Sequence, residues 1–84
     1  MKILLDINGE EYTVTSDEQQ YIVGVEELDE TRTRMRRPAY FASLDGVFRH
    51  LLGLKLRTSD ATTFRELLEI TNQFRGEMRQ LFSL

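Results

Sequence analysis

The sequence predicts one α+β domain, in which a four-stranded antiparallel β-meander is followed by two α-helices packed on one face. Short runs rich in β-branched and aromatic residues fill the first half of the chain, as is typical of strands. The second half repeats apolar residues every three or four positions, as is typical of amphipathic helices. A chain of 84 residues suits a single domain, 1–84, with a small core.

The first two strands are predicted at residues 2–7 and 10–15, on either side of the dipeptide Asn8-Gly9. Asn-Gly favours a two-residue type I′ turn, because both central residues of that turn need positive φ. The run after the turn alternates polar and apolar residues, as expected of a strand with one buried face. These two strands are therefore expected to form a hairpin.

The third strand is predicted at residues 20–28, which are dense in β-branched and aromatic side chains. Gly24 within it marks a β-bulge or a close backbone approach, or is an ordinary strand glycine. We interpret the strongly charged stretch 29–37 as a long hairpin tip. The fourth strand follows at residues 38–42, where Pro38 has no N–H to donate and so fits the start of a strand or an edge.

The first helix is predicted at residues 44–56, with Ser43 as its N-cap. Its apolar face is formed by Leu44, Val47, Phe48, Leu51 and Leu52. Gly46 and Gly53 weaken the helix relative to alanine, which suggests that one or both allow close packing on the sheet.

The second helix is predicted at residues 64–81, after a capping box formed by Thr63 and Glu66. Its apolar stripe continues to the end of the sequence through Met78, Leu81, Phe82 and Leu84. This stripe is longer than a small sheet and one helix obviously need to cover. Two interpretations stay open: the stripe completes the core, or it forms an exposed patch for a partner, such as a homodimer through Met78, Leu81 and Phe82.

Charge is divided along the chain, although the net value is only -3. Residues 1–30 carry one lysine and nine acids, whereas residues 31–84 carry ten basic residues and five acids. The net charges of the two halves, -8 and +5, therefore have opposite sign. Either the halves compensate each other in the folded protein, or they form a dipolar surface that steers a charged partner.

The sequence has no cysteine, so neither disulfides nor thiolate metal sites can form. Residues 1–6 lack the apolar core of a signal peptide, and no stretch approaches the roughly 20 apolar residues of a membrane span. We therefore expect a soluble protein in the cytoplasm, with no membrane partner.

Few residues could carry out catalysis. His50 is the one histidine, and its place beside the apolar helix face favours a surface or boundary position over a role as a general base. It shows no ligand spacing with carboxylates, and the sequence has no glycine-rich phosphate loop. We therefore predict a non-enzymatic protein with no metal and no cofactor.

Two stretches of the second half carry a resemblance. Residues 40–48 read Tyr-Phe-Ala-Ser-Leu-Asp-Gly-Val-Phe, and residues 55–69 read Lys-Leu-Arg-Thr-Ser-Asp-Ala-Thr-Thr-Phe-Arg-Glu-Leu-Leu-Glu. Together with residues 15–17 and 21–23, they resemble a group of small uncharacterised proteins encoded by bacteriophages and mobile elements. The chain departs from that group by having Asp-Gly-Val in place of Glu-Gly-Ala, and by its arginine-rich stretch.

The resemblance implies a bacterial host cell as the setting and a protein that acts by binding. Small, acidic, cysteine-free phage proteins often act on host machinery, and anti-CRISPR proteins and other inhibitors of defence systems share this size and composition. The function implied is inhibition or modulation of a host nucleoprotein machine, with a host nucleic-acid-handling complex as the protein partner.

Two charged sets are the candidate contact residues. The arginine set is Arg32, Arg34, Arg36 and Arg37, and the acidic set is Glu26, Glu27, Asp29 and Glu30. On an extended strand three of the arginines point the same way, which suits an acidic protein surface or the phosphates of a nucleic acid. The acids suit a basic groove that normally receives nucleic acid. Which set binds, and whether nucleic acid is contacted directly, stays open, as does a structural or oligomeric accessory role.

Overall fold

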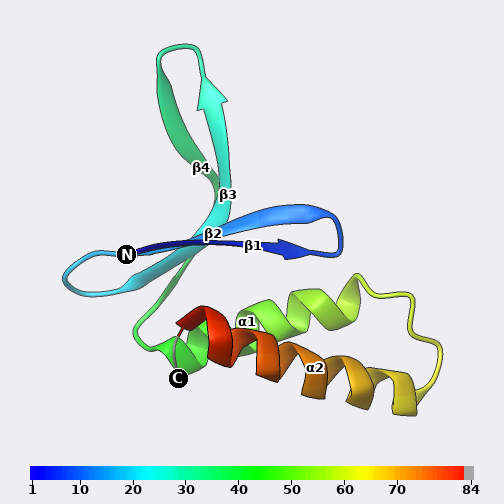
Figure 1. Ribbon diagram of the computed structural model, residues 1–84. Helices are drawn as coiled ribbons and strands as arrows, with labels where there is room; N and C mark the ends of the chain where they lie inside the picture. The colour runs from blue at the N-terminus through cyan, green and yellow to red at the C-terminus, as the bar shows by residue number, and fades with distance from the viewer. Residues whose placement is uncertain (83–84) are drawn as a thin grey trace.

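The computed structural model describes residues 1–82 and confirms the predicted α+β architecture (Figure 1). The elements are β1 (Lys2–Ile7), β2 (Glu10–Ser16), β3 (Tyr21–Asp29), β4 (Arg32–Phe41), α1 (Leu44–Arg57) and α2 (Phe64–Phe82). The strands form one antiparallel sheet in chain order, β1-β2-β3-β4. Both helices lie on the same side of the sheet in Figure 1, so one face of the sheet is covered and the other is open.

The core lies between the sheet and the helix pair. Its buried apolar side chains are Leu5, Ile7, Val14, Val23, Val47, Leu51, Phe74 and Met78. Helix α1 lies against β1, β3 and β4, and α2 packs alongside α1. The rings of Phe48 and Phe74 stack across the helix pair at 6.1 Å, which ties α2 to α1.

The turn between β1 and β2 has the predicted type of backbone, with φ of 50° at Asn8 and 97° at Gly9. Asn8 has a second role that the sequence did not reveal. Its Nδ2 donates to the carbonyl oxygen of Lys55 at 2.9 Å and to Oγ1 of Thr58 at 2.8 Å. The hairpin is therefore fastened to the C-terminal end of α1, where carbonyl groups lack partners within the helix.

The predicted N-terminal caps of both helices are present. Ser43 Oγ accepts from the N–H of Gly46, and Thr63 Oγ1 accepts from the N–H of Glu66, each at 3.2 Å. The Phe41 ring of β4 lies close to Gly46, where an added Cβ would come within 3.2 Å of it. Of the two glycines in α1, Gly46 is therefore the one that allows close packing on the sheet.

The predicted long hairpin tip at 29–37 is wrong. Strand β4 begins at Arg32, six residues before the predicted start, and the connection to β3 consists of Glu30 and Thr31 alone. The register is regular from Val25 opposite Arg36 to Asp29 opposite Arg32. Opposite charges on neighbouring strands can pair across a ladder, so a strongly charged run is compatible with a strand.

A β-bulge explains why the early part of β4 was missed. Val23 faces Ala39 but Val25 faces Arg36, so Arg37 and Pro38 together oppose Gly24. The extra residue reverses the alternation of faces along β4, and Arg37 adopts the left-handed conformation with φ of 51°. Of the three interpretations left open for Gly24, the structure therefore supports the bulge and the close approach over an ordinary strand glycine.

The C-terminal apolar stripe is divided between core and surface. Met78 is 4% exposed and belongs to the core, and Phe82 is half-buried against it. Leu81 remains 42% exposed. Of the three side chains of the predicted homodimer, Leu81 therefore offers the most exposed surface, and the homodimer itself stays a prediction. Leu84 lies outside the described residues.

Candidate partner-binding arm

The outer parts of β3 and β4 form a two-stranded arm that leaves the rest of the sheet (Figure 1). Strand β2 pairs with β3 only over residues 21–24, so residues 25–29 pair with 32–36 alone. We call residues 25–36 the arm. The Cα radius of gyration is 13.7 Å, against about 12 Å expected for a compact domain of this length. The arm therefore extends beyond the compact body.

One face of the arm is a ladder of alternating charge. The register places Glu27 and Asp29 on the same face as Arg32, Arg34 and Arg36. Arg36 Nε lies 3.0 Å from Glu27 Oε1, and Arg34 Nη1 lies 3.7 Å from Asp29 Oδ2. The three arginines share a face, as predicted, but two of them already face carboxylates of the neighbouring strand.

Three further ion pairs lie where the arm joins the sheet. Glu10 Oε1 accepts from Arg37 Nη2 at 2.8 Å and lies 3.7 Å from Arg36 Nη2. On the opposite face, Lys2 Nζ lies 2.9 Å from Glu26 Oε1. Six of the eight predicted contact residues are thus in ion pairs, and the acidic and arginine sets form one interleaved surface. This arrangement supports the interpretation in which the charges of the two halves compensate each other, and not the one in which they form two separate charged surfaces.

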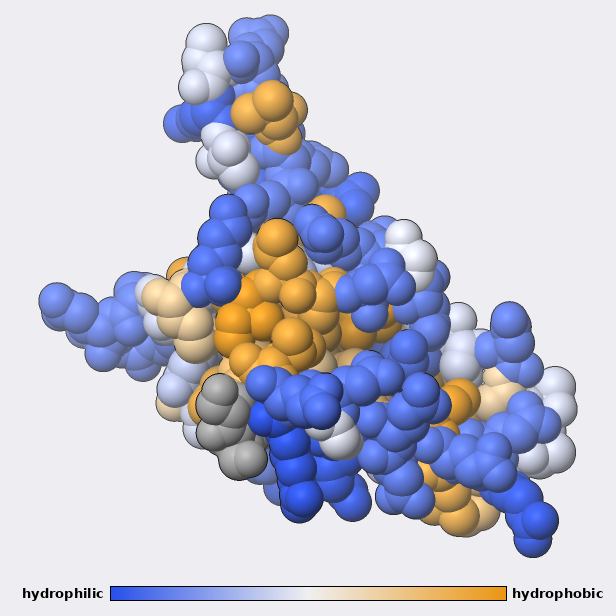
Figure 2. Space-filling model, in the orientation of Figure 1, coloured by the Kyte–Doolittle hydropathy of each residue, from blue (hydrophilic) through white to orange (hydrophobic). Residues whose placement is uncertain are grey.

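The other face of the arm carries an apolar residue that the sequence reasoning passed over. It presents Glu26, Leu28, Thr33 and Met35, and Leu28 is 84% exposed. Most of the arm is hydrophilic in the space-filling view (Figure 2). The alternation of residues 25–29 in the sequence indicates that Leu28 lies on the face opposite the charged one. The predicted contact residues were chosen by charge alone, so Leu28 was not among them.

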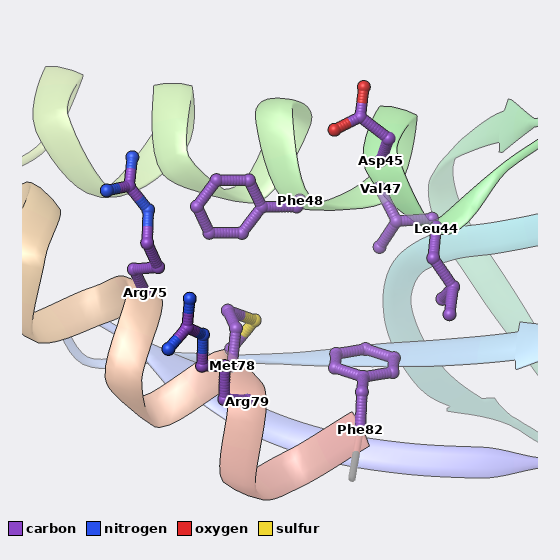
Figure 3. Close-up of a pocket in the computed structure, with 8 residues that line it drawn as sticks. All are labelled: Leu44, Asp45, Val47, Phe48, Arg75, Met78, Arg79 and Phe82. Carbon is purple, nitrogen blue, oxygen red and sulfur yellow. The ribbon is translucent and has the colours of Figure 1, made fainter. Parts of the chain in front are cut away.

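Apart from the arm, the structure has a pocket between the two helices (Figure 3). This cavity of about 280 Å³ has an apolar wall that includes Phe48, Met78 and Phe82, with Arg75 and Arg79 on the α2 side. The one carboxylate among its lining residues belongs to Asp45, which pairs with Arg49 at 3.1 Å. The cavity can accept an apolar group, but its lining presents no nucleophile held by a base.

His50 lies at the boundary between α1 and the sheet. Its ring packs against that of Phe41, with centroids 5.0 Å apart. Burial, helped by the positive charge of Arg57, lowers the pKa of His50 below its ordinary value. A side chain held against an aromatic ring in this way supports the interpretation of His50 as a packing residue.

The lowered pKa of His50 predicts a loss of stability on mild acidification. The unfolded chain, with an ordinary histidine pKa near 6.5, binds a proton more readily than the folded chain, so the free energy of unfolding falls as pH drops below about 6.5. Urea unfolding between about pH 7.5 and 5.5 checks this, with His50→Gln as the control that flattens the profile. A profile equally steep in both proteins would contradict the prediction.

Within residues 1–82, no group of three or more histidine or acidic side chains is placed to hold a metal ion. Neither helix of this part of the chain is long and apolar enough to cross a membrane. No family model, curated protein or solved structure matches the chain.

Proposed function

We propose that the chain is a non-enzymatic binding protein that recognises another protein through the arm. The observation that carries this proposal is an arm that projects from the body while exposing a leucine on one of its faces. An isolated two-stranded hairpin is marginally stable in water, and none of the buried core residues lies within the arm. Its length is therefore unexplained by the needs of the fold and suits insertion into a partner surface.

The charges of the arm favour a protein partner over nucleic acid. Residues 25–36 carry four acids and three arginines, so the arm has no excess of positive charge. Phosphate binding depends on unneutralised lysine and arginine, whereas Arg34 and Arg36 already face carboxylates. A ladder of both signs on one face, with an exposed leucine on the other, instead resembles the mixed polar and apolar surfaces at which proteins meet.

The narrower proposal is that the partner is a host nucleic-acid-handling complex, which the protein inhibits or modulates, as an anti-CRISPR protein does. It rests on the resemblance to small phage and mobile-element proteins, and on the acid-rich strands that would approach a basic surface. Direct binding of nucleic acid through the arginines is the alternative. It predicts a mobility shift at low salt that is lost when the arginine set, Arg32, Arg34, Arg36 and Arg37, is replaced by alanine.

The test of the arm is Leu28→Asp in a pull-down from bacterial lysate, followed by affinity measurement with the captured partner. We expect about a tenfold or greater loss of affinity, because the side chain that is buried in the proposed complex would then be a carboxylate, which must be desolvated on binding. The free energy of unfolding should change by no more than about 0.5 kcal/mol, because Leu28 is exposed in the free protein.

Leu68→Asp is the matched control. Leu68 is an exposed leucine on α2, away from the arm, so the same change of side chain should leave capture intact. Equal capture by the wild type, Leu28→Asp and Leu68→Asp would show that the arm is not the binding surface. Loss of capture in both variants would point to a general effect of added charge.

A further inference from the structure

The two edges of the sheet are protected to different degrees. Strand β4 carries Pro38, a bulge and several arginines, which are features that discourage pairing with a further strand. Strand β1, the other edge, pairs with β2 in an unbroken register and contains neither proline nor a bulge. Its outer side faces no strand within residues 1–82. The edge of β1 is therefore open to strand addition.

The backbone groups on this open edge follow from the turn. In a hairpin closed by two residues the flanking pair, here Ile7 and Glu10, is hydrogen-bonded, and bonded pairs alternate with non-bonded pairs from there. The residues of β1 that direct their N–H and C=O groups away from β2 are therefore Lys2, Leu4 and Asp6.

A groove lined by both apolar and polar side chains runs beside this edge. It has a volume of about 470 Å³ and lies between β1 and α2, where Leu5 and Met78 line it and Leu81 forms part of its rim. Leu4, on the strand itself, is 49% exposed. Figure 2 shows apolar surface gathered in this region, between the arm and the helices. Such a patch marks a surface that is covered in an assembly.

We propose that β1 pairs with β1 of a second copy of this chain, antiparallel about Leu4, to form a two-fold homodimer with one continuous sheet. In this register Leu4 faces its own copy, and Lys2 of each chain faces Asp6 of the other. The three residues with outward backbone groups are thus the ones that pair, and their charges are complementary at both ends. Isologous contacts of this kind are the commonest in homo-oligomers.

The helix-facing side chains fit the same register. Ile3 and Leu5 lie on the covered face of β1. In the proposed register Ile3 of each chain lies opposite Leu5 of the other, next to the groove beside α2, so that pairing covers apolar surface that one chain leaves open. The dimer also places one arm at each end of the continuous sheet, so that two arms are available to a partner with repeated sites.

Charge substitutions at the two ends of β1 test the register directly. Lys2→Asp places acids opposite acids in the dimer, and Asp6→Lys places lysines opposite lysines. We expect each variant alone to self-associate about tenfold more weakly than the wild type, measured by sedimentation equilibrium. An equimolar mixture of the two variants should form a heterodimer with an affinity within about threefold of the wild type, because every pair is again complementary.

Two controls separate the interface from the fold. Glu26→Gln removes the ion pair that Lys2 makes within its own chain, and Glu11→Lys changes a neighbouring acid of β2 that is not on the edge. Both should dimerise as the wild type does. A wild-type protein that stays monomeric up to about millimolar concentration would overturn the proposal, and so would a mixture of the two charge variants that associates no better than each alone. Neither outcome bears on the arm, which the Leu28 variant tests separately.

Discussion

Replacing Phe74 by alanine is expected to lower the free energy of unfolding by about 3–5 kcal/mol. The side chain is 1% exposed and belongs to the core between sheet and helices. Its ring also stacks on Phe48, and its helix packs beside α1 with few direct contacts to the strands. The substitution would leave a cavity at the point where α2 is held to the rest of the protein.

The expected loss is a large share of the total free energy of unfolding. A domain of 84 residues has a total stability of about 4–13 kcal/mol, so Phe74→Ala should remove from about a quarter to all of it. Urea unfolding followed by circular dichroism measures the effect. Phe64→Ala is the control on the same helix, since Phe64 is 74% exposed and its loss should change stability by about 0.5 kcal/mol or less. Similar values for the two variants would mean that α2 does not depend on this contact.

The elements that the sequence predicted well depend on local signals. The turn at Asn8-Gly9 needs positive φ at two successive residues, and the structure has it. The N-caps Ser43 and Thr63 accept hydrogen bonds from N–H groups three residues further along, a separation short enough for a local sequence pattern to predict. Helix periodicity likewise placed Val47 and Leu51 on the apolar face of α1, and both are buried in the core.

The features that the sequence did not reveal depend on pairs of distant residues. The first half of β4 is stabilised by contacts between Arg36 and Glu27 and between Arg34 and Asp29, and neither strand alone shows that these charges will meet. The docking of Asn8 on the end of α1 joins residues 47 and 50 positions apart. Such contacts follow from the register and the packing, which single-strand patterns do not contain.

The predicted contact residues lie together in one segment of the structure, but they do not form the separate acidic and arginine surfaces that the sequence predicted. All eight predicted residues lie on the arm or at its base, because the charged run coincides with the segment that leaves the sheet. The division into an acidic and an arginine surface fails, since cross-strand pairing interleaves the two sets. The alternation of residues 25–29 separates Leu28 from the charged face but does not show whether its own face is covered, because that depends on where the arm leaves the body.

Gly24→Ala is expected to destabilise the protein by about 1–3 kcal/mol, although it adds a single carbon. A Cβ on Gly24 would collide with Cγ of Met35, lie 2.6 Å from its sulfur and come within 3.0 Å of the carbonyl oxygen of Arg36. Both neighbours belong to the arm, on the side of the bulge that sets its direction. The substitution should therefore disturb the arm more than the helix pair, which hydrogen exchange of the arm amides can measure.

Two further variants show whether the collision is the cause. Gly24→Ala combined with Met35→Ala removes the flexible neighbour but not the Arg36 carbonyl, so the loss should shrink without vanishing, and the two substitutions should couple by about 1 kcal/mol. Gly76→Ala is the matched control, because its Cβ would meet nothing within 4 Å and α2 should gain about 0.5–1 kcal/mol. If Gly24→Ala instead stabilises the protein as Gly76→Ala does, then the packing of Met35 over Gly24 is not what holds the bulge and directs the arm.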